Sequence, residues 1–196
     1  YILSKYIYSK KQNINFDHNE ITQELKELNN KVALILNNQN KIKEISKGFS
    51  KLEHILFLGR DIMYPVAMEG ALKMKEVCYI HAEAYPAGEM KHGVNALIGE
   101  KMPSLVMAPT GISFNKMLST INEIKARDGK VIGLTDNDNN EFISLLSNYL
   151  IIDSYNYNLD VILYSINLQL LSFYTSLLLK INPDRPRNLA KTVTVE

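Results

Sequence analysis

Three charged residues in one predicted helix have the types and spacing to transfer a proton. Glu69, Lys73 and Glu76 follow one another at intervals of four and three residues, which places them on one face of a helix. The residues that flank this face are apolar or small: Val66, Met68, Gly70, Leu72 and Val77. Desolvation and mutual charge shift proton affinities in such surroundings, as an acid–base catalyst requires. From spacing alone, the plainer interpretation is a ladder of salt bridges, each worth roughly a few tenths of a kcal/mol.

The helix that carries these residues is predicted from Pro65 to Tyr79. Proline is tolerated in a first helical turn, and Gly70 is the only breaker before Tyr79. On the opposite face, small and apolar residues form a second stripe that should meet the core: Ala67, Ala71, Met74 and Cys78. Cys78 is the only cysteine of the chain and cannot form an internal disulfide, so we interpret it as a small core residue.

Four segments in a fixed order carry a resemblance to a known family. They are EGALKMKE at 69–76, EAY at 83–85, KHG at 91–93 and RNLAKTVTVE at 187–196. Together they resemble the isomerase domain of the glutamine:fructose-6-phosphate amidotransferases, also called glucosamine-6-phosphate synthases. The resemblance runs from about Phe57 to Glu196. It implies that the chain takes part in converting fructose 6-phosphate into glucosamine 6-phosphate with ammonia from glutamine.

The resemblance also implies roles for individual residues. Glu76 matches the base that moves a proton between C1 and C2 of the sugar, and Lys191 matches the lysine that forms a Schiff base with the open-chain ketose. His92 matches the acid and base of ring opening, which the neighbouring subunit contributes. Lys73 matches a lysine beside the base, and Lys73 and Ala190 are the expected substrate contacts. No cofactor and no metal are implied.

Each of these residues also has an ordinary structural explanation. Glu76 can be a salt-bridge partner of Lys73, Lys191 a solvated tail residue, and His92 a loop histidine bonded to the backbone. The chain departs from the family at Val94, where proline commonly follows KHG, and this change is expected to loosen the loop that holds His92.

The resemblance predicts how the chain is organised. Residues 1–50 are expected to be a helical segment from the end of a first sugar-isomerase (SIS) subdomain and its connector. Residues 51–182 are expected to form the second SIS subdomain, and 183–196 an active-site tail. The chain begins inside a predicted helix, so we expect it to be a piece of a longer protein. A glutaminase domain and the phosphate-gripping loop of the first subdomain would lie outside it, and the expected assembly is a homodimer.

Two other functions stay open. The chain could be a standalone sugar-phosphate isomerase, which needs no glutaminase partner. It could also be a non-catalytic SIS domain that senses a sugar phosphate, which needs no Schiff-base lysine. The tail with Lys191 discriminates between a sensor and an enzyme.

Short apolar runs alternate with helical patterns and predict an α/β fold with a doubly wound, Rossmann-like parallel sheet. The four predicted strands are 54–59, 104–108, 130–134 and 149–152. Two or three helices are predicted over 17–48, with Asp17 as a cap and a turn at 36–40. A closing helix from Leu159 to about Lys180 should pack against the sheet or a partner subunit.

The composition argues against several classes of partner. A net charge of +1, from 22 basic and 21 acidic residues, gives no electrostatic case for nucleic acid or an anionic membrane. We find no signal-like start and no apolar run near 18 residues, so a soluble cytoplasmic protein is expected.

Three short motifs resemble ion-binding sites. Two of them lack a residue that the site requires, and the third is weak evidence for binding. Asp136–Asn140 starts like a calcium loop but has Glu141 where glycine is required, so a capped turn is expected. His81-Ala82-Glu83 is similar to a deaminase zinc motif, which needs a later Cys-x-x-Cys that one cysteine cannot supply. The turn 108–113 leaves a strand for a helix and has the backbone amides to bind a phosphate, although most such turns bind nothing.

Overall fold

Five parallel strands form the centre of the protein, in the order β2-β1-β3-β4-β5. The computed structural model describes residues 1–187. The strands are β1 (His54–Gly59), β2 (His81–Pro86), β3 (Ser104–Met107), β4 (Val131–Thr135) and β5 (Asn148–Ile151). The helices are α1 (Ile2–Gln12), α2 (His18–Asn37), α3 (Asn40–Phe49), α4 (Met63–Cys78), α5 (Phe114–Lys125), α6 (Asn140–Ile143) and α7 (Tyr157–Leu178). Two short 3₁₀ turns, η1 (Met90–His92) and η2 (Val94–Leu97), follow β2.

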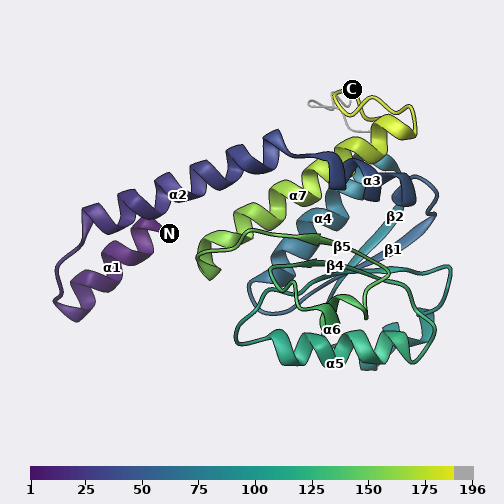
Figure 1. The fold of residues 1–196 in the computed structure, drawn as a ribbon, viewed down its shortest axis with the longest axis horizontal. Helices are drawn as coiled ribbons and strands as arrows, with labels where there is room; N and C mark the ends of the chain where they lie inside the picture. The colour runs from purple at the N-terminus through teal and green to yellow at the C-terminus, as the bar shows by residue number, and fades with distance from the viewer. Residues whose placement is uncertain (188–196) are drawn as a thin grey trace, which may run out of the picture.

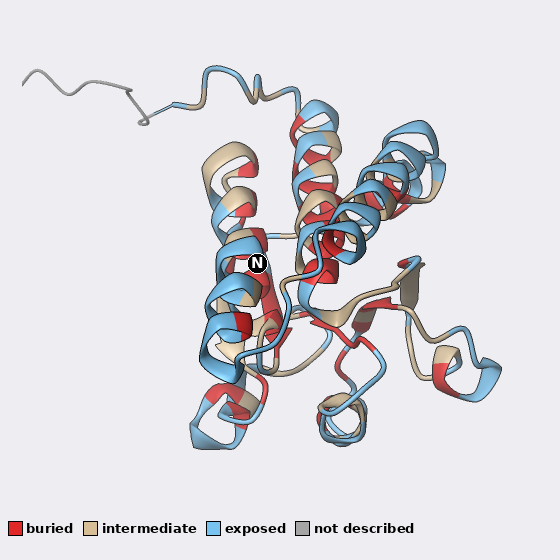
Figure 2. Cartoon of the chain, turned by 90° about the vertical axis from the view of Figure 1, so that its left-hand side faces the viewer, coloured by how far each residue is buried: buried red, intermediate tan, exposed pale blue. Residues whose placement is uncertain are grey.

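Helices cover both faces of the sheet, which confirms the predicted doubly wound α/β fold (Figure 1). Helices α3, α4 and α7 lie on one face, and α5 and α6 lie on the other. Phe57 of β1 points into the first layer and Leu58 into the second, as alternation along a strand requires. Figure 2 shows the buried residues gathered in the strands and on the inner sides of the helices, whereas α1 and most of α2 are exposed.

The four predicted strands are present, each with ends within one residue of the prediction. Strand β2 was not predicted from the sequence, and its presence corrects the expected set of four strands. His81, Glu83 and Tyr85 alternate there with small residues, so the segment has no apolar run. Among residues 1–187, β2 pairs only with β1 and forms an edge of the sheet, which is why it can keep polar side chains on one face.

Helix α4 begins directly after the sheet and ends where the chain returns to it. The prediction of 65–79 is confirmed with a start two residues earlier, and Pro65 lies in the first turn. A Cβ at Gly59 would come within 2.1 Å of the Met63 carbonyl oxygen, so only glycine allows this close approach of strand and helix. The helix ends at Cys78, and Tyr79 takes the left-handed conformation with a φ of 58°.

The predicted core stripe of α4 is also confirmed. Its four members are at most 3% exposed: Ala67, Ala71, Met74 and Cys78. They pack in one cluster with residues of β1, α3 and α7. The opposite face with its three charged residues is therefore left on the outer side of the layer.

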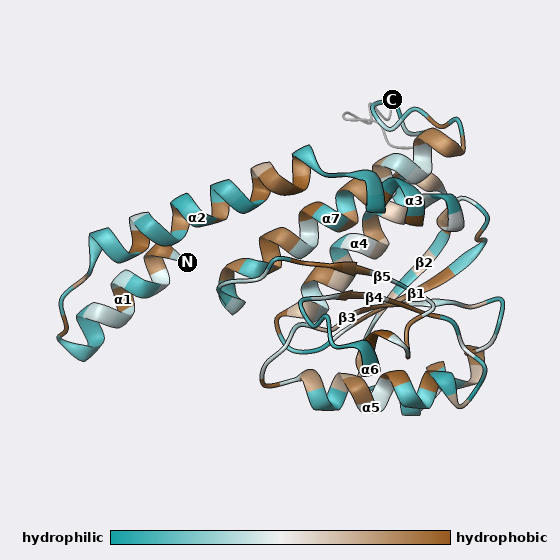
Figure 3. Cartoon of the chain, in the orientation of Figure 1, coloured by the Kyte–Doolittle hydropathy of each residue, from teal (hydrophilic) through white to brown (hydrophobic). Residues whose placement is uncertain are grey.

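The helical segment before the sheet also matches its prediction. The Asp17 carboxylate accepts hydrogen bonds from the amides of Asn19 and Glu20, which caps α2. Helix α2 ends at Asn37 and α3 begins at Asn40, where the turn was expected. In Figure 3 the polar side of α2 contrasts with the apolar strands of the sheet.

Helix α7 corrects the expectation that the chain lacks an apolar run near membrane length. Its 22 residues contain a window of mean hydropathy 1.4, which is enough to cross a membrane by length and composition. Within this fold, however, α7 packs against α3 and α4, and Leu163 and Tyr164 are fully buried. A long core helix has the same composition, so α7 is weak evidence of a membrane span.

Candidate functional site

Lys73 and Glu76 form a close, half-buried ion pair near the end of α4. The Lys73 Nζ lies 2.6 Å from Glu76 Oε2, and the two side chains are 32% and 28% exposed. The hydrogen bond to Glu76 is the main cause that raises the pKa of Lys73 above its ordinary value. The lysine therefore stays protonated beside the carboxylate and holds it in place through a charge-assisted hydrogen bond. The salt-bridge interpretation is confirmed for this pair, and its geometry also suits proton transfer.

Glu69, the third member of the charged face, is held by another helix. Its Oε1 accepts a hydrogen bond of 3.1 Å from the Gln169 side-chain amide of α7. Its charge also contributes to the raised pKa of Lys73. Glu69 lies about two turns of helix before Glu76, so we assign it to positioning α4 against α7.

Residues near the end of the described chain return to the same end of α4. The Arg187 amide donates a 2.5 Å hydrogen bond to the Tyr79 hydroxyl. The Arg187 guanidinium also lies over the Tyr79 ring, 4.2 Å from its centroid. Tyr79 follows Glu76 by three residues, so Arg187 contacts the same end of α4 that carries the ion pair. Tyr79 was not predicted to anchor the chain. The one feature of the sequence that could have indicated this role is an aromatic residue at the end of a predicted helix. Lys191 and Ala190, which were predicted as site residues, lie outside the described residues 1–187.

His92 lies at the other end of the sheet from Glu76. It is part of η1, beyond the carboxyl end of β2, and its side chain is 76% exposed. Its described partner is Glu89, with 3.7 Å between His92 Nε2 and Glu89 Oε2. Glu76 instead precedes the amino end of β2, and that strand alone is about 20 Å long. A single chain therefore does not bring Glu76 and His92 together.

The loop that carries His92 is anchored on both sides. Met90 is 1% exposed and Val94 is 8% exposed, and both pack under α5. The Lys91 ammonium lies 3.2 Å from the Glu123 carboxylate of α5. Val94, where proline was expected, therefore fixes the loop by burial.

The turn at 108–113 has a different role from binding a phosphate. The Thr110 amide donates a 2.6 Å hydrogen bond to Asp136 Oδ1, and the Thr110 hydroxyl donates one of 2.7 Å to Asp136 Oδ2. A carboxylate thus already accepts hydrogen bonds from both donors of Thr110, and its charge would repel an anion. Asn139 caps α6 through the amides of Glu141 and Phe142, as the expected capped turn requires.

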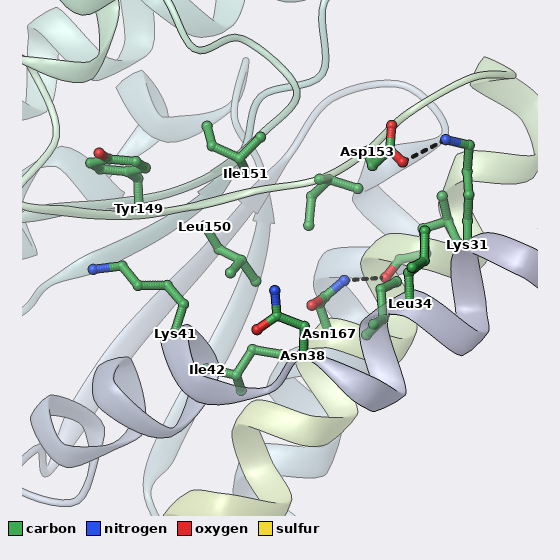
Figure 4. Close-up of a pocket in the computed structure, with 13 residues that line it drawn as sticks. Lys31, Leu34, Asn38, Lys41, Ile42, Tyr149, Leu150, Ile151, Asp153 and Asn167 are labelled. Carbon is green, nitrogen blue, oxygen red and sulfur yellow. Dashed lines mark hydrogen bonds and ion pairs between the residues drawn. The ribbon is translucent and has the colours of Figure 1, made fainter.

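A hollow of about 540 Å³ lies far from these residues, at the other edge of the sheet (Figure 4). It is bounded by edge strand β5 and by the elbow between α2 and α3. Its charged groups are already paired: the Lys31 ammonium lies 2.7 Å from Asp153, and the Lys41 ammonium lies 3.2 Å from Glu44. Lys73 and Glu76, the predicted site residues that the structure describes as a pair, lie near the β2 edge instead. We therefore do not place the functional site in this hollow.

Comparisons with known proteins show which proteins the chain resembles. A family model described as the SIS domain matches residues 48–179. The glutamine–fructose-6-phosphate aminotransferase (isomerizing) of Methanosarcina acetivorans is 43% identical over 173 residues, or 88% of this chain. The chain spans only 28% of the length of that relative.

Solved structures show the same likeness. The C-terminal domain of glucosamine-fructose-6-phosphate aminotransferase from Francisella tularensis is 38% identical, with a TM-score of 0.76 over 85% of this chain and 47% of that chain. A tagatose-6-phosphate ketose/aldose isomerase from Escherichia coli has a TM-score of 0.74 at 16% identity, over 88% of this chain and 48% of that chain. At that identity the second likeness is one of fold alone.

Proposed function

The chain belongs to the SIS domain family, and from that premise we propose that it forms the second SIS subdomain of a glutamine–fructose-6-phosphate aminotransferase. The proposed reaction converts fructose 6-phosphate and glutamine-derived ammonia into glucosamine 6-phosphate. In this proposal 1–50 connects to a first SIS subdomain, 51–182 is the isomerase subdomain and 183–196 is the active-site tail. A glutaminase domain and the first subdomain complete the parent protein.

The observation that carries the proposal is the Lys73–Glu76 pair beside the anchored Arg187. Isomerisation moves one proton from C1 to C2 of the open-chain sugar, so one group must take it and return it. The Glu76 carboxylate is partly exposed, which leaves it accessible to a substrate, and its ion pair with Lys73 fixes its position. We assign the base to Glu76 and a positioning and substrate-binding role to Lys73.

Lys191 is the proposed Schiff-base residue. Its amine adds to the C2 carbonyl of the ketose and water leaves. Ammonia then displaces the Lys191 amine from C2, and the resulting ketose imine acidifies the C1–H bond from which Glu76 takes a proton and returns it to C2. Four peptide units separate Lys191 from Arg187, so its Cα lies at most about 14 Å from that of Arg187. Tyr79 anchors Arg187 close to Glu76. This reach allows Lys191 and Glu76 to act on one sugar, and we place Ala190 beside it as a substrate contact.

The proposed homodimer explains the distance between Glu76 and His92. A two-fold axis across the middle of the β2 edge would exchange the two ends of that edge. It would bring the His92 of each protomer toward the Glu76 end of the other, where ring opening takes place. Met68 and Leu72 flank the charged face of α4 and are 50% and 42% exposed, which provides apolar surface for such a contact.

Borohydride trapping tests the proposal. In the parent enzyme, incubation with fructose 6-phosphate followed by borohydride should reduce an imine on Lys191 and add the sugar mass to the peptide that contains it. Lys191→Arg should abolish the adduct, and Glu76→Gln should keep the adduct but lose turnover. An adduct on a different lysine would contradict the Schiff-base assignment. The 196-residue chain itself should make no glucosamine 6-phosphate from fructose 6-phosphate and glutamine, and turnover by it would show that the substrate site lies within this chain.

A further inference from the structure

Two histidines face each other on the β2 edge of the sheet, outside the proposed isomerase site. His54 begins β1 and His81 begins β2, and the parallel register pairs them directly. Their Nδ1 atoms are 3.1 Å apart, and both residues are exposed. Both point to the face of the sheet that α5 covers, whereas Glu76 belongs to α4 on the opposite face. The pair has no role in the proposed isomerisation.

We propose that the facing Nδ1 atoms of His54 and His81 chelate a divalent first-row transition metal such as Zn²⁺, Ni²⁺ or Cu²⁺. Metal–imidazole bonds are about 2.0–2.1 Å long. At ligand angles between about 90° and 110°, two such nitrogens lie about 2.9–3.4 Å apart, and the observed 3.1 Å falls within that interval. Imidazole is a preferred ligand of these metals.

A second layer of contacts orients His81 for this role. Its other ring nitrogen, Nε2, lies 3.4 Å from Glu83 Oε1. A proton on Nε2 that faces a carboxylate leaves the Nδ1 lone pair free, and this arrangement is common for histidines that bind metals. Glu83 is held in turn, because the Tyr85 hydroxyl donates a 2.8 Å hydrogen bond to its Oε2. That hydrogen bond raises the pKa of Tyr85, so the phenol remains a donor.

A metal bound by His54 and His81 would affect the stability of the sheet edge. Within residues 1–187 no third histidine, cysteine or carboxylate joins it as a ligand, so water completes the coordination. The metal would link the first residue of the edge strand β2 to its neighbour β1. It would therefore stabilise the folded chain in proportion to its concentration and would hold the turn between α4 and β2.

Calorimetric titration of the untagged 196-residue chain with ZnCl₂ tests the site. We expect one Zn²⁺ per chain, and a melting temperature that rises with the Zn²⁺ concentration. His54→Asn and His81→Asn should each lower the affinity by at least about tenfold, and Glu83→Gln should lower it by about 10–100-fold. The matched control is His18→Asn, because His18 is an exposed histidine at the start of α2, and its affinity should equal that of the unchanged chain.

Two results would overturn the proposal. One is the absence of Zn²⁺ binding in the unchanged chain, which would leave the pair as a simple hydrogen bond between imidazoles. The other is full affinity in His81→Asn, which would assign the metal to another group such as His92 with Glu89. Electron paramagnetic resonance of the unchanged chain with one equivalent of Cu²⁺ needs no variant. Hyperfine coupling to two imidazole nitrogens is expected, and coupling to none or one would count against the chelate.

Discussion

Glu76 and His92 lie at opposite ends of strand β2, although only 16 positions separate them in the sequence. Helix α4 delivers Glu76 to the amino end of the strand, and η1 holds His92 beyond its carboxyl end. If both residues act on one sugar, they must come from two chains.

Cross-linking tests this arrangement. The double variant Glu76→Cys/His92→Cys, treated with a short bis-maleimide, should give a covalent dimer on denaturing gels. The strand between the two positions is about 20 Å long, so a short linker cannot join them within one chain. Glu76→Cys and His92→Cys alone serve as controls and should give little dimer. A double variant that remains monomeric on the gel, together with a monomeric mass in sedimentation, would contradict the proposed interface.

Lys73 should contribute to stability only up to alkaline pH. Its pKa is raised above the ordinary 10.5, so the folded chain holds this proton more tightly than the unfolded chain does. The contribution is complete below about pH 10.5 and is lost as the pH rises through the folded-state pKa. Because both partners are partly exposed, it should stay below about 1 kcal/mol.

Urea unfolding of Lys73→Met at pH 8 and pH 11 measures this effect. The difference in unfolding free energy from the unchanged chain should shrink at the higher pH. Lys75→Met is the matched control, because Lys75 is exposed on the same helix and has no ion pair with a described residue. Equal and pH-independent losses in both variants would refute the special role of the pair.

Substitution of Gly70 by alanine should destabilise the folded chain, although Gly70 lies in a helix, where alanine is normally favoured. A Cβ there would come within 2.8 Å of Leu168 Cδ1 and 3.0 Å of the Phe57 ring, and both neighbours are buried. Overpacking of this kind costs about 1–3 kcal/mol, which exceeds the gain of up to about 1 kcal/mol in helix propensity.

Thermal or chemical unfolding of Gly70→Ala should therefore show a less stable chain. In Gly48→Ala the new methyl group meets nothing within 4 Å, so this control should be more stable by about 0.5–1 kcal/mol. Stabilisation by both substitutions would show that α4 and α7 are not packed as described.

Cys78 should be unreactive until the protein unfolds. Its side chain is buried, its Sγ donates a 3.1 Å hydrogen bond to the Ser172 carbonyl, and desolvation raises the pKa of the thiol to about 12. The thiolate, not the thiol, attacks a disulfide reagent such as DTNB, so the folded chain should release almost no product at pH 8. The same chain in guanidinium chloride should react with one equivalent at once. Fast reaction of the folded chain would mean that the contact between α4 and α7 opens readily.

Elements with a local pattern were predictable from the amino-acid sequence. The two stripes of α4, the Asp17 cap and four of the strands follow from a period of 3.6 or from short apolar runs, and the structure agrees with each. The close pairing of Lys73 with Glu76 was also predictable, because three residues of helix place two side chains side by side. The proposed role of Glu76 as a base comes from the family resemblance and not from periodicity.

Contacts between segments that are distant in the sequence were visible only in the folded structure. Strand β2 exists because β1 offers it a pairing edge, so its polar alternation is no local signal. The facing of His54 and His81 depends on the register between the two strands, and a shift of one residue would turn one ring to the other face. The anchoring of Arg187 on Tyr79 joins residues 108 positions apart. Such contacts arise when the helices and the sheet pack together, and the periodic pattern of residues along the chain contains no information about them.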